Sequence, residues 1–408
     1  MLSDTHSPST GRMKYIKTAG IICEYNPFHL GHAAHIEKTR RILDQDCGVV
    51  CVMSGNFVQR GDFAIFSKHA RAMAALRCGA DLVVELPSAY ALSSAEGFAA
   101  AGVYLLDSLG VCDCVSFGSE SGDIGKLWEA AEATATAESG ALIKEWMGAG
   151  LPYASALQKT ADCILGEGSG IFKSPNNLLG IEYLKTIKAS DSMLKPITVK
   201  RIGGAHDGDK GISASALRKL ILDGGSPQKN MPRTAAAVYK GEIEAGRGPV
   251  TIKAFELAML SRLRAAEDFS NLAGASEGLD RRFMKYAKSE PTIEAFLEKV
   301  KTKRYAMSRL RRMLICACLE ITAGDTESPP PYIRVLAMNS VGMRLLKAAQ
   351  ANTALPIITK PAAAQKLPGK AGELFRKEAA ATDFYALGYP NENQRAGGQE
   401  WTTSPVID

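Results

Sequence analysis

The chain has 408 residues, of which 46% are hydrophobic and 23% are charged, so it can build a sizeable core and fill two or three domains. Its net charge of +6 permits a polyanionic partner without requiring one. No apolar run approaches the ~18–20 residues of a membrane span, which excludes that class of protein, and we expect no membrane partner.

The nine cysteines are an odd number and form no CxxC pair, so the sequence predicts neither a disulfide framework nor a zinc ribbon. Several lie in apolar runs such as GVVCVM and MLICACL, where a thiol acts as a small hydrophobe. A reducing compartment fits this usage, and we expect a cytoplasmic protein. Residues 1–13 are polar, lack the apolar core of a signal peptide and are expected to form a disordered extension.

From residue 14 to residue 225, short apolar runs alternate with stretches of helical spacing. The runs expected to be buried strands are residues 18–23, 47–53, 80–86, 112–118 and 196–202. The helical stretches are residues 30–44, 67–78, 92–109, 122–137 and 176–188. Continuous apolar strands separated by helices favour a parallel sheet covered on both faces. The sequence therefore predicts an α/β domain with a doubly wound parallel sheet, which binds ligands at the carboxyl ends of its strands.

A Gly/Pro-rich segment, GGSPQKNMPR at residues 224–233, ends this alternation. Beyond it the chain is rich in Ala, Leu and Arg with helical periodicity, as in TIKAFELAMLSRLRAAED, and the strand pattern stops. We expect residues 226–408 to form a mainly helical domain with an extended tail.

The stretch EYNPFHLGHAAH at residues 24–35 directly follows the first expected strand. Its histidines, spaced three apart, are His29, His32 and His35. Two histidines at this spacing on a helix can share a zinc ion, with Cys23 or Glu24 as a further ligand, although HxxH alone is a weak signal. An ordinary turn and helix start, with Asn26-Pro27 as the turn, is a second interpretation.

A nucleotide site is the third interpretation of the same stretch. Gly31 lets the backbone approach a ligand closely, and the start of a helix attracts phosphate. His29 and His32 can then donate hydrogen bonds to phosphate oxygens as charge develops there. The pattern H-L-G-H matches the HxGH signature of nucleotidylyltransferases.

Residues 212–218, ISASALR, resemble the ISSTxxR motif that begins a later helix in the same superfamily. Ser213 can cap that helix, and Arg218 then points at the triphosphate one and a half turns further on. A plain N-cap is the alternative interpretation, because Ser before an apolar helix is common. Each motif opens a helix after a candidate strand, so the two together favour a nucleotide site.

Further segments narrow the resemblance: residues 54–87 with FVQRG, SFGSE at 116–120, SPNNLLGIEYLK at 174–185 and KRIGGAHDG at 200–208. With EYNPFHLGH, they resemble the bacterial tRNA(Met) cytidine acetate ligase family. The resemblance runs from about residue 20 through KTKRYAMSRLRRML, PYIRVLAMN and ATDFYAL in the tail. The departures are small, because Leu30 fills the variable slot of HxGH and RIGGAHDG lacks an aromatic residue before its His.

The resemblance implies a Rossmann-like nucleotidylyltransferase fold and a two-step reaction. Acetate attacks the α-phosphate of ATP, giving acetyl-adenylate and pyrophosphate. The exocyclic amine of the wobble cytidine in the elongator tRNA(Met) anticodon then takes the acetyl group, giving N4-acetylcytidine. The implied cofactors are ATP and Mg²⁺, the implied partners are acetate and tRNA(Met), and no obligate protein partner is expected.

The resemblance also implies site residues. The expected catalytic residues are His29 and His32, which hold the phosphates, and Ser213 and Arg218, which grip the leaving β/γ end. The expected ATP-binding residues are Ile22, Cys23, Glu24, Tyr25, Asn26, Pro27, Phe28, His29, Leu30, Gly31, His32, His35, Gly118, Asn176, Asn177, Arg201 and Ile202. Simpler roles remain open for some of them: a turn glycine for Gly118, a helix start for Asn176 and a surface charge for Arg201.

The stretch KVKTKRYAMSRLRRM at residues 299–313 carries seven cations and no acidic residue. On one helix, Arg304, Arg311 and Arg312 would share a face that suits phosphate contacts, and Tyr305 could stack on a base. A solvated helix without a partner is the alternative. The expected tRNA-binding residues are Lys303, Arg304, Arg309, Arg311 and Arg312.

Several residues have no settled role. Asn56, Gln59, Arg60 and Lys68 lie on a stretch that either closes over the site or is a solvated loop. Two aspartates, Asp62 and Asp81, could help to hold a metal but are more often solvated. The sequence shows no obvious base for the cytidine amine.

Two other functions stay open. One is a different HxGH adenylyl- or cytidylyltransferase that acts on a small phosphate compound and has no need of the basic helical region. The other is a tRNA-binding protein whose site has lost activity, although the intact HxGH and ISASALR motifs argue against it.

Overall fold

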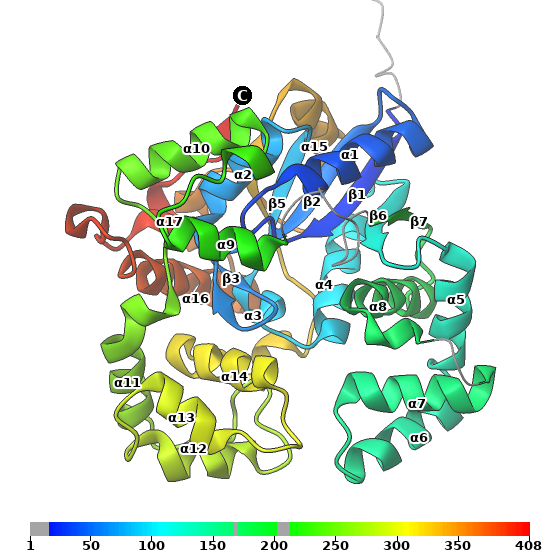
Figure 1. Ribbon diagram of the computed structural model, residues 1–408. Helices are drawn as coiled ribbons and strands as arrows, with labels where there is room; N and C mark the ends of the chain where they lie inside the picture. The colour runs from blue at the N-terminus through cyan, green and yellow to red at the C-terminus, as the bar shows by residue number, and fades with distance from the viewer. Residues whose placement is uncertain (1–15, 167–169, 202–212) are drawn as a thin grey trace, which may run out of the picture.

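The computed structural model describes residues 16–166, 170–201 and 213–408 (Figure 1). Its central strands are β1 (Thr18–Cys23), β2 (Gly48–Ser54), β5 (Leu82–Leu86), β6 (Cys114–Ser119) and β7 (Lys195–Lys200). They are parallel and lie in the order β5-β2-β1-β6-β7. Strand order therefore reverses between β1 and β6, and such a switch point is where doubly wound sheets bind ligands.

Alternate residues of each strand face opposite sides of the sheet. Val50 and Val52 of β2 belong to the core that contains α4 (Ala95–Ser108) and α8 (Pro175–Ala189). Val49 and Cys51 belong to the other core, on the side of α1 (Leu30–Leu43), α2 (Lys68–Leu76), α9 (Ala214–Leu222) and α10 (Arg233–Glu244). This two-sided cover confirms the predicted doubly wound α/β class.

Each expected strand and helix of the first 200 residues is present, with bounds shifted by a few residues. The last strand ends at Lys200, two residues earlier than expected. The pattern missed α3 (Ser88–Ala91), α6 (Ala137–Gly148) and α7 (Tyr153–Leu165), while α5 (Ile124–Ala133) falls where a helix was expected. The expected extension at residues 1–13 lies outside the described residues.

The second half of the chain is mainly helical, as expected, with α11 (Glu256–Ala265), α12 (Leu279–Ala287), α13 (Ile293–Val300), α14 (Met307–Leu319), α15 (Ser340–Asn352), α16 (Gly369–Ala386) and α17 (Gln399–Thr402). The expectation that strands stop after residue 234 is wrong. Strand β8 (Ile333–Met338) pairs antiparallel with β5, while β9 (Ile357–Ile358) and β10 (Val406–Ile407) pair with β8. Pairing covers an edge that β5 would otherwise expose. A domain boundary at residue 225 stays a prediction.

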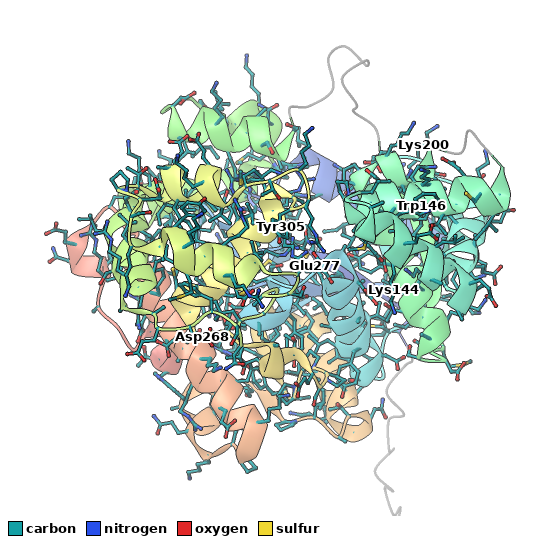
Figure 2. The ribbon with its side chains drawn as sticks, turned by 90° about the horizontal axis from the view of Figure 1, so that it is seen from below. Lys144, Trp146, Lys200, Asp268, Glu277 and Tyr305 are labelled. Atoms are coloured by element: carbon teal, nitrogen blue, oxygen red, sulfur yellow. The ribbon has the colours of Figure 1, made fainter. Side chains whose placement is uncertain are left out.

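The carboxyl ends of the parallel strands point toward α9 and β3 (Phe57–Val58), in the middle of Figure 1. Below them, α11–α14 lie on one side and α6–α7 on the other. Figure 2 gives the view from below, in which Glu277 and Tyr305 mark the first group and Lys144 and Trp146 mark the second. None of the described helices is long and apolar enough to cross a membrane.

A buried group of charges joins the two halves of the chain. Lys68, which falls within the expected helix at residues 67–78, is the first residue of α2 and is fully buried, so it belongs neither to a closing loop nor to a solvated one. Its Nζ lies 2.7 Å from Glu85 Oε1, 2.5 Å from Glu400 Oε2 and 3.8 Å from Glu378 Oε1. Arg334 Nε lies 3.1 Å from Glu400 Oε1. Burial alone would lower the pKa of Lys68, but the three carboxylates raise it above its usual value.

Replacing Lys68 by Met should destabilise the fold by ~3–5 kcal/mol, because removing one partner leaves buried carboxylates without compensation. Equilibrium denaturant unfolding measures this free energy. Lys347→Met, on the exposed side of α15, is the matched control and should change stability by less than ~0.5 kcal/mol. If the two variants had the same free energy of unfolding, the expected contribution of this ion group to stability would be contradicted.

Candidate functional site

The turn between β1 and α1 is built around two histidines. His29 caps α1: its Nδ1 accepts the Gly31 N–H at 3.0 Å, and Nδ1 of His32 accepts the His29 N–H at 3.2 Å. The two rings stack with centroids 3.7 Å apart. A Cβ at Gly31 would lie 2.9 Å from Cε1 of His29, so this position needs glycine. Because both Nδ1 atoms accept hydrogen bonds, each neutral ring carries its proton on Nε2.

Both histidines are neutral near pH 7. Burial, assisted by the positive charge of Arg201, lowers the pKa of His29 to about 4. Burial, the neighbouring His29 and Arg201 lower the pKa of His32 well below its usual value. The site therefore offers a phosphate two uncharged Nε2–H donors, and its positive charge comes from arginines.

The structure brings the two predicted motifs together. Ser213 caps α9 by accepting the Ala216 N–H at 3.2 Å. From the same helix, Arg218 Nη1 donates to the Asn26 carbonyl oxygen at 2.9 Å and Nη2 donates to Ser215 Oγ at 3.1 Å. The guanidinium thus lies against the turn that carries the histidines, although about 190 residues separate Asn26 from Arg218 in the sequence.

The residues of the turn differ in how far their side chains are buried. Tyr25 and Phe28 are buried and pack around His32, with ring centroids 4.8 and 5.5 Å from it. Ile22 is buried in the sheet core, whereas Cys23 is partly exposed and Leu30 is exposed. Ile65 N–H donates to Asn26 Oδ1 at 2.9 Å, and Pro27 follows through a cis peptide bond. Ile22, Tyr25 and Phe28 therefore line the turn from inside, and their expected contacts with ATP stay predictions.

His35, one turn further along α1, is committed elsewhere. Its Nε2 lies 3.0 Å from Ser116 Oγ, which also bonds Thr39 Oγ1 at 2.6 Å. Burial, with Arg201 and Lys38 nearby, lowers the pKa of His35 to about 4. The residue fastens α1 to β6, and its expected contact with ATP stays a prediction.

At the end of β6, Gly118 makes room for Arg201. The Arg201 N–H donates to the Ser119 carbonyl oxygen at 2.9 Å, so Arg201 extends the pairing of β7. A Cβ at Gly118 would lie 3.2 Å from Cγ of Arg201. The guanidinium lies close enough to His29, His32 and His35 to lower the pKa of each. Ile202 and His206 lie outside the described residues.

Asn176 and Asn177 lie at the start of α8 and bind Glu120, a residue to which no motif assigned a role. Asn176 Nδ2 donates to Glu120 Oε1 at 2.6 Å, and the Asn177 N–H donates to Oε2 at 3.0 Å. Asn177 is buried, and its Oδ1 accepts the Ser121 N–H at 3.0 Å. Both asparagines therefore shape the loop after β6, and a ligand contact by either stays a prediction.

Arg71 was missed altogether. It lies on α2, is fully buried and donates to four backbone carbonyls, those of Glu24 (2.5 Å), Phe66 (3.0 Å), Ser54 (3.1 Å) and Gly55. It therefore fixes the chain where both β1 and β2 end. No local signal reveals this role, because an arginine in a helix is usually solvated.

The expected metal role of the aspartates finds no support. Asp81 is buried, lies 2.8 Å from Arg40 Nη2 and accepts the Val49 N–H. Asp62 accepts the Phe63 N–H at 2.9 Å. Within residues 16–166, 170–201 and 213–408, no three His, Cys, Asp or Glu side chains gather in a metal-binding group, so the zinc interpretation lacks further ligands there.

The basic stretch at residues 299–313 is not one helix. Helix α13 ends at Val300 and α14 begins at Met307, so Arg304 lies on the connection and does not share a helical face with Arg311. Tyr305 is buried, and its hydroxyl donates to the Glu277 carbonyl oxygen at 2.7 Å. The expected stacking of Tyr305 on a base is therefore wrong. Sequence periodicity missed the break because the cationic residues continue across it.

The cations of this stretch have two kinds of surroundings. Arg309 and Arg312 are half-buried: Arg309 Nη1 lies 2.8 Å from Glu277 Oε2, and Arg312 Nη1 donates to the Gln59 carbonyl oxygen at 3.3 Å. In contrast, Lys303, Arg304 and Arg311 are exposed, although Arg304 Nε also lies 3.7 Å from Glu277 Oε2.

The loop around Gln59 lies between α14 and the turn after β1 and contacts both. The Gln59 N–H donates to Glu24 Oε1 at 2.7 Å, while the Gln59 carbonyl accepts from Arg312. Gly61 has a positive φ of 73°, and a Cβ there would lie 2.4 Å from the Arg312 backbone nitrogen. The loop is thus packed against α14, so the basic stretch adjoins the histidine turn.

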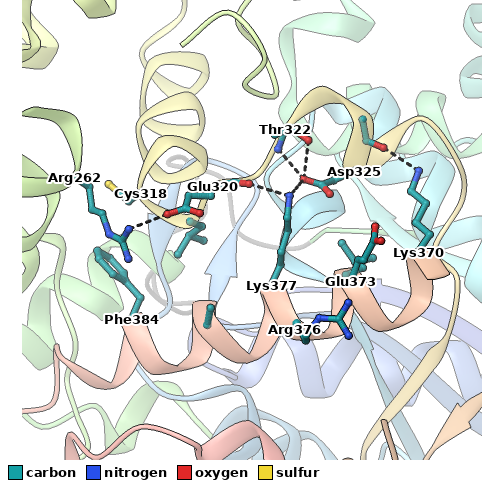
Figure 3. Close-up of a pocket in the computed structure, with 14 residues that line it drawn as sticks. Arg262, Cys318, Glu320, Thr322, Asp325, Lys370, Glu373, Arg376, Lys377 and Phe384 are labelled. Atoms are coloured by element: carbon teal, nitrogen blue, oxygen red, sulfur yellow. Dashed lines mark hydrogen bonds and ion pairs between the residues drawn. The ribbon is translucent and has the colours of Figure 1, made fainter. Parts of the chain in front are cut away.

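A cavity of about 830 Å³ lies elsewhere, between the end of α14 and α16 (Figure 3). Lys377 Nζ lies 2.6 Å from Asp325 Oδ2, and Arg262 Nη1 lies 2.8 Å from Glu320 Oε1. Both of these cations are paired with neighbouring carboxylates, and no residue of the HxGH turn lines the cavity. The candidate site is the histidine turn.

Comparison with known proteins defines the class. Residues 16–400 match the family model described as HIGH Nucleotidyl Transferase, and the chain belongs to this family. It is 40% identical over 384 residues to the tRNA(Met) cytidine acetate ligase of Caldicellulosiruptor saccharolyticus, covering 92% of this chain and 94% of the relative. With its counterpart from Acetivibrio thermocellus it shares 36% identity over 423 residues, covering 96% and 100%.

The fold of the chain is also similar to that of a solved structure. The crystal structure of Thermotoga maritima TmcAL bound with alpha-thio ATP has a TM-score of 0.89 and 32% identity, covering 96% of this chain and 99% of that one. An apo form of the same protein gives a TM-score of 0.88. The chain belongs to the tRNA(Met) cytidine acetate ligase family, as its sequence motifs predicted.

The histidine geometry predicts a spectroscopic result. In ¹⁵N-labelled protein at pH 6, His29 and His32 should both appear as neutral Nε2–H tautomers, and His29 should titrate with a pKa of about 4. Arg201→Gln should raise the pKa of His29 only partly, because burial is the larger cause. Titration of His29 near the unperturbed value of about 6.5 would contradict this arrangement.

Proposed function

We propose that the chain is an ATP-dependent ligase that activates acetate as acetyl-adenylate and transfers the acetyl group to the wobble cytidine of elongator tRNA(Met), forming N4-acetylcytidine. The observation that carries this proposal is the convergence of the HxGH turn with Arg218 at the switch point of the sheet. Its support includes the names of the relatives and the nucleotide analogue in the Thermotoga maritima structure.

In the first step acetate displaces pyrophosphate from the α-phosphate, so catalysis rests on positioning and charge stabilisation. We assign the Nε2–H groups of His29 and His32 to the phosphates. Arg218 has five N–H donors and uses two on Asn26 and Ser215, which leaves three for the leaving β/γ end. Ser213, exposed at the start of α9, adds a hydroxyl and the helix N-terminus to the same end.

Mg²⁺ commonly binds ATP phosphates together with only one or two protein carboxylates. Since the described residues gather no metal-binding group, we propose that Mg²⁺ enters on the triphosphate, where it would neutralise phosphate charge. No side chain is assigned to it. The remaining expected ATP contacts, at residues 22–31, 118, 176–177 and 201–202, belong to the same proposal.

We assign tRNA binding to the surface that begins beside this site. Lys303, Arg304 and Arg311 are exposed and suit phosphate contacts. Arg309 and Arg312 are mainly positioning residues of this surface, since they bind Glu277 and the Gln59 carbonyl. An anticodon held here would lie next to the adenylate.

Incubation with labelled acetate, ATP and tRNA(Met), followed by nucleoside analysis, should yield N4-acetylcytidine. ATP–pyrophosphate exchange should depend on acetate and not on tRNA. Arg218→Lys should lower the exchange rate at least about tenfold, because lysine cannot present several donors in one plane. Exchange that depends instead on a phosphorylated metabolite would favour a different nucleotidylyltransferase.

A triple change of Lys303, Arg304 and Arg311 to Gln should weaken tRNA binding at least tenfold and leave ATP affinity unchanged. The slope of log affinity against log salt should fall by about 2–3, since each lost phosphate contact removes roughly 0.7–0.9. The matched control changes the exposed Lys229, Lys240 and Lys347 to Gln, which alters net charge equally. Equal weakening of the two triple variants would show that location does not matter and would refute this surface.

A further inference from the structure

The second step of the proposed reaction needs a proton acceptor. When the N4 amine of cytidine attacks an acetyl carbonyl, the nitrogen must lose a proton to give a neutral amide. His29 and His32 are poor candidates, because each ring nitrogen is already committed, Nδ1 as an acceptor and Nε2 as the protonated donor. A base must therefore come from another group that faces the same turn.

Glu24 has the required position. It directly follows β1, five residues before His29. Its Oε1 is fixed by the Gln59 N–H at 2.7 Å. In the part of the chain that the structure describes, Oε2 has no hydrogen-bond partner, and no cation forms an ion pair with Glu24 within 4.0 Å. One oxygen is anchored and the other remains free to take a proton.

The surroundings of Glu24 include charged and titratable groups from four directions. Arg71 of α2, Arg218 of α9, Arg60 of the loop between β3 and β4 (Asp62–Phe63) and Tyr183 of α8 face it. Burial raises the pKa of Glu24, and the hydrogen bond from Gln59 together with the three arginines only partly offsets this effect. The carboxylate is therefore a stronger base than an exposed glutamate.

Glu24 is linked through Gln59 to the surface where tRNA is expected. Gln59 binds Glu24 through its N–H and Arg312 through its carbonyl, so a single residue separates the carboxylate from α14. A cytosine ring of the tRNA that enters from the side of the exposed Arg311 would meet this loop first. The carboxylate thus lies between the nucleotide end of the site and the RNA-facing surface.

We propose that Glu24 is the general base of acetyl transfer, an inference that rests on the proposed function. The lone pair of N4 attacks the acetyl carbonyl carbon, and the bond between this carbon and the phosphate oxygen of the adenylate breaks. The electron pair of that bond stays on AMP, the N4 proton passes to the Glu24 carboxylate, and water later removes it. The products are N4-acetylcytidine and AMP, so atoms and charge balance.

The test supplies synthetic acetyl-adenylate and tRNA(Met) directly and measures single-turnover transfer, which bypasses ATP activation. Glu24→Gln keeps an oxygen that accepts the Gln59 N–H but cannot take a proton. Its transfer rate should fall about 10²–10⁴-fold, the usual contribution of a general base. In the unchanged protein the rate should rise with pH through the raised pKa of Glu24, because only the ionised form is a base, and Glu24→Gln should lose this limb.

Matched variants separate the possible failures. Glu37→Gln makes the same chemical change on the exposed side of α1 and should transfer at the rate of the unchanged protein. Glu24→Asp retains a carboxylate, so its transfer rate should be lower but should still rise with pH. If the unchanged protein transfers no acetyl group from acetyl-adenylate, the proposed function fails. If it transfers normally but Glu24→Gln keeps its rate and pH limb, or Glu24→Asp loses the limb, the base assignment is overturned.

Discussion

The site depends on how the backbone after β1 is held. Between Glu24 and Phe28 the chain has left the sheet, and its buried polar groups need partners from elsewhere. The partners come from three helices distant in sequence: Arg71 of α2 binds the Glu24 carbonyl, Arg218 of α9 binds the Asn26 carbonyl, and Tyr239 of α10 accepts the Phe28 N–H. The position of the two histidines therefore follows from packing throughout the domain.

In this arrangement, neutral histidines and arginines have different electrostatic roles. Stacked and partly buried imidazoles stay neutral, so they can place hydrogen bonds on phosphate without repelling each other. Arg218 lies against the histidine turn and Arg201 lies beside the histidines, so the positive charge of the site comes from guanidinium groups. Glu24 lies near Arg71, Arg218 and Arg60 without a close ion pair, and among the described residues its Oε2 has no hydrogen-bond partner, which leaves this oxygen available for chemistry.

The two halves of the chain act as one structural unit around the site. Strand β8 extends the sheet at β5, and Glu378 and Glu400 of the C-terminal helices neutralise Lys68 beneath the loop that carries Gln59. That loop contacts Glu24 on one side and Arg312 on the other. A tRNA bound along α14, as proposed, would therefore lie beside this loop.

The sequence by itself determined the five parallel strands, five of the helices between them and the two motifs, because periodicity and capping are local properties of the chain. Only the tertiary structure decided the surroundings of the charges. Lys68 was expected on a closing or a solvated loop and Arg71 had no predicted role, yet both are buried, because carboxylates and carbonyls from distant segments compensate them. Likewise Tyr305 reads as an RNA-stacking residue but is enclosed by its own domain. Whether a polar side chain is buried depends on partners that the chain supplies only once it is folded.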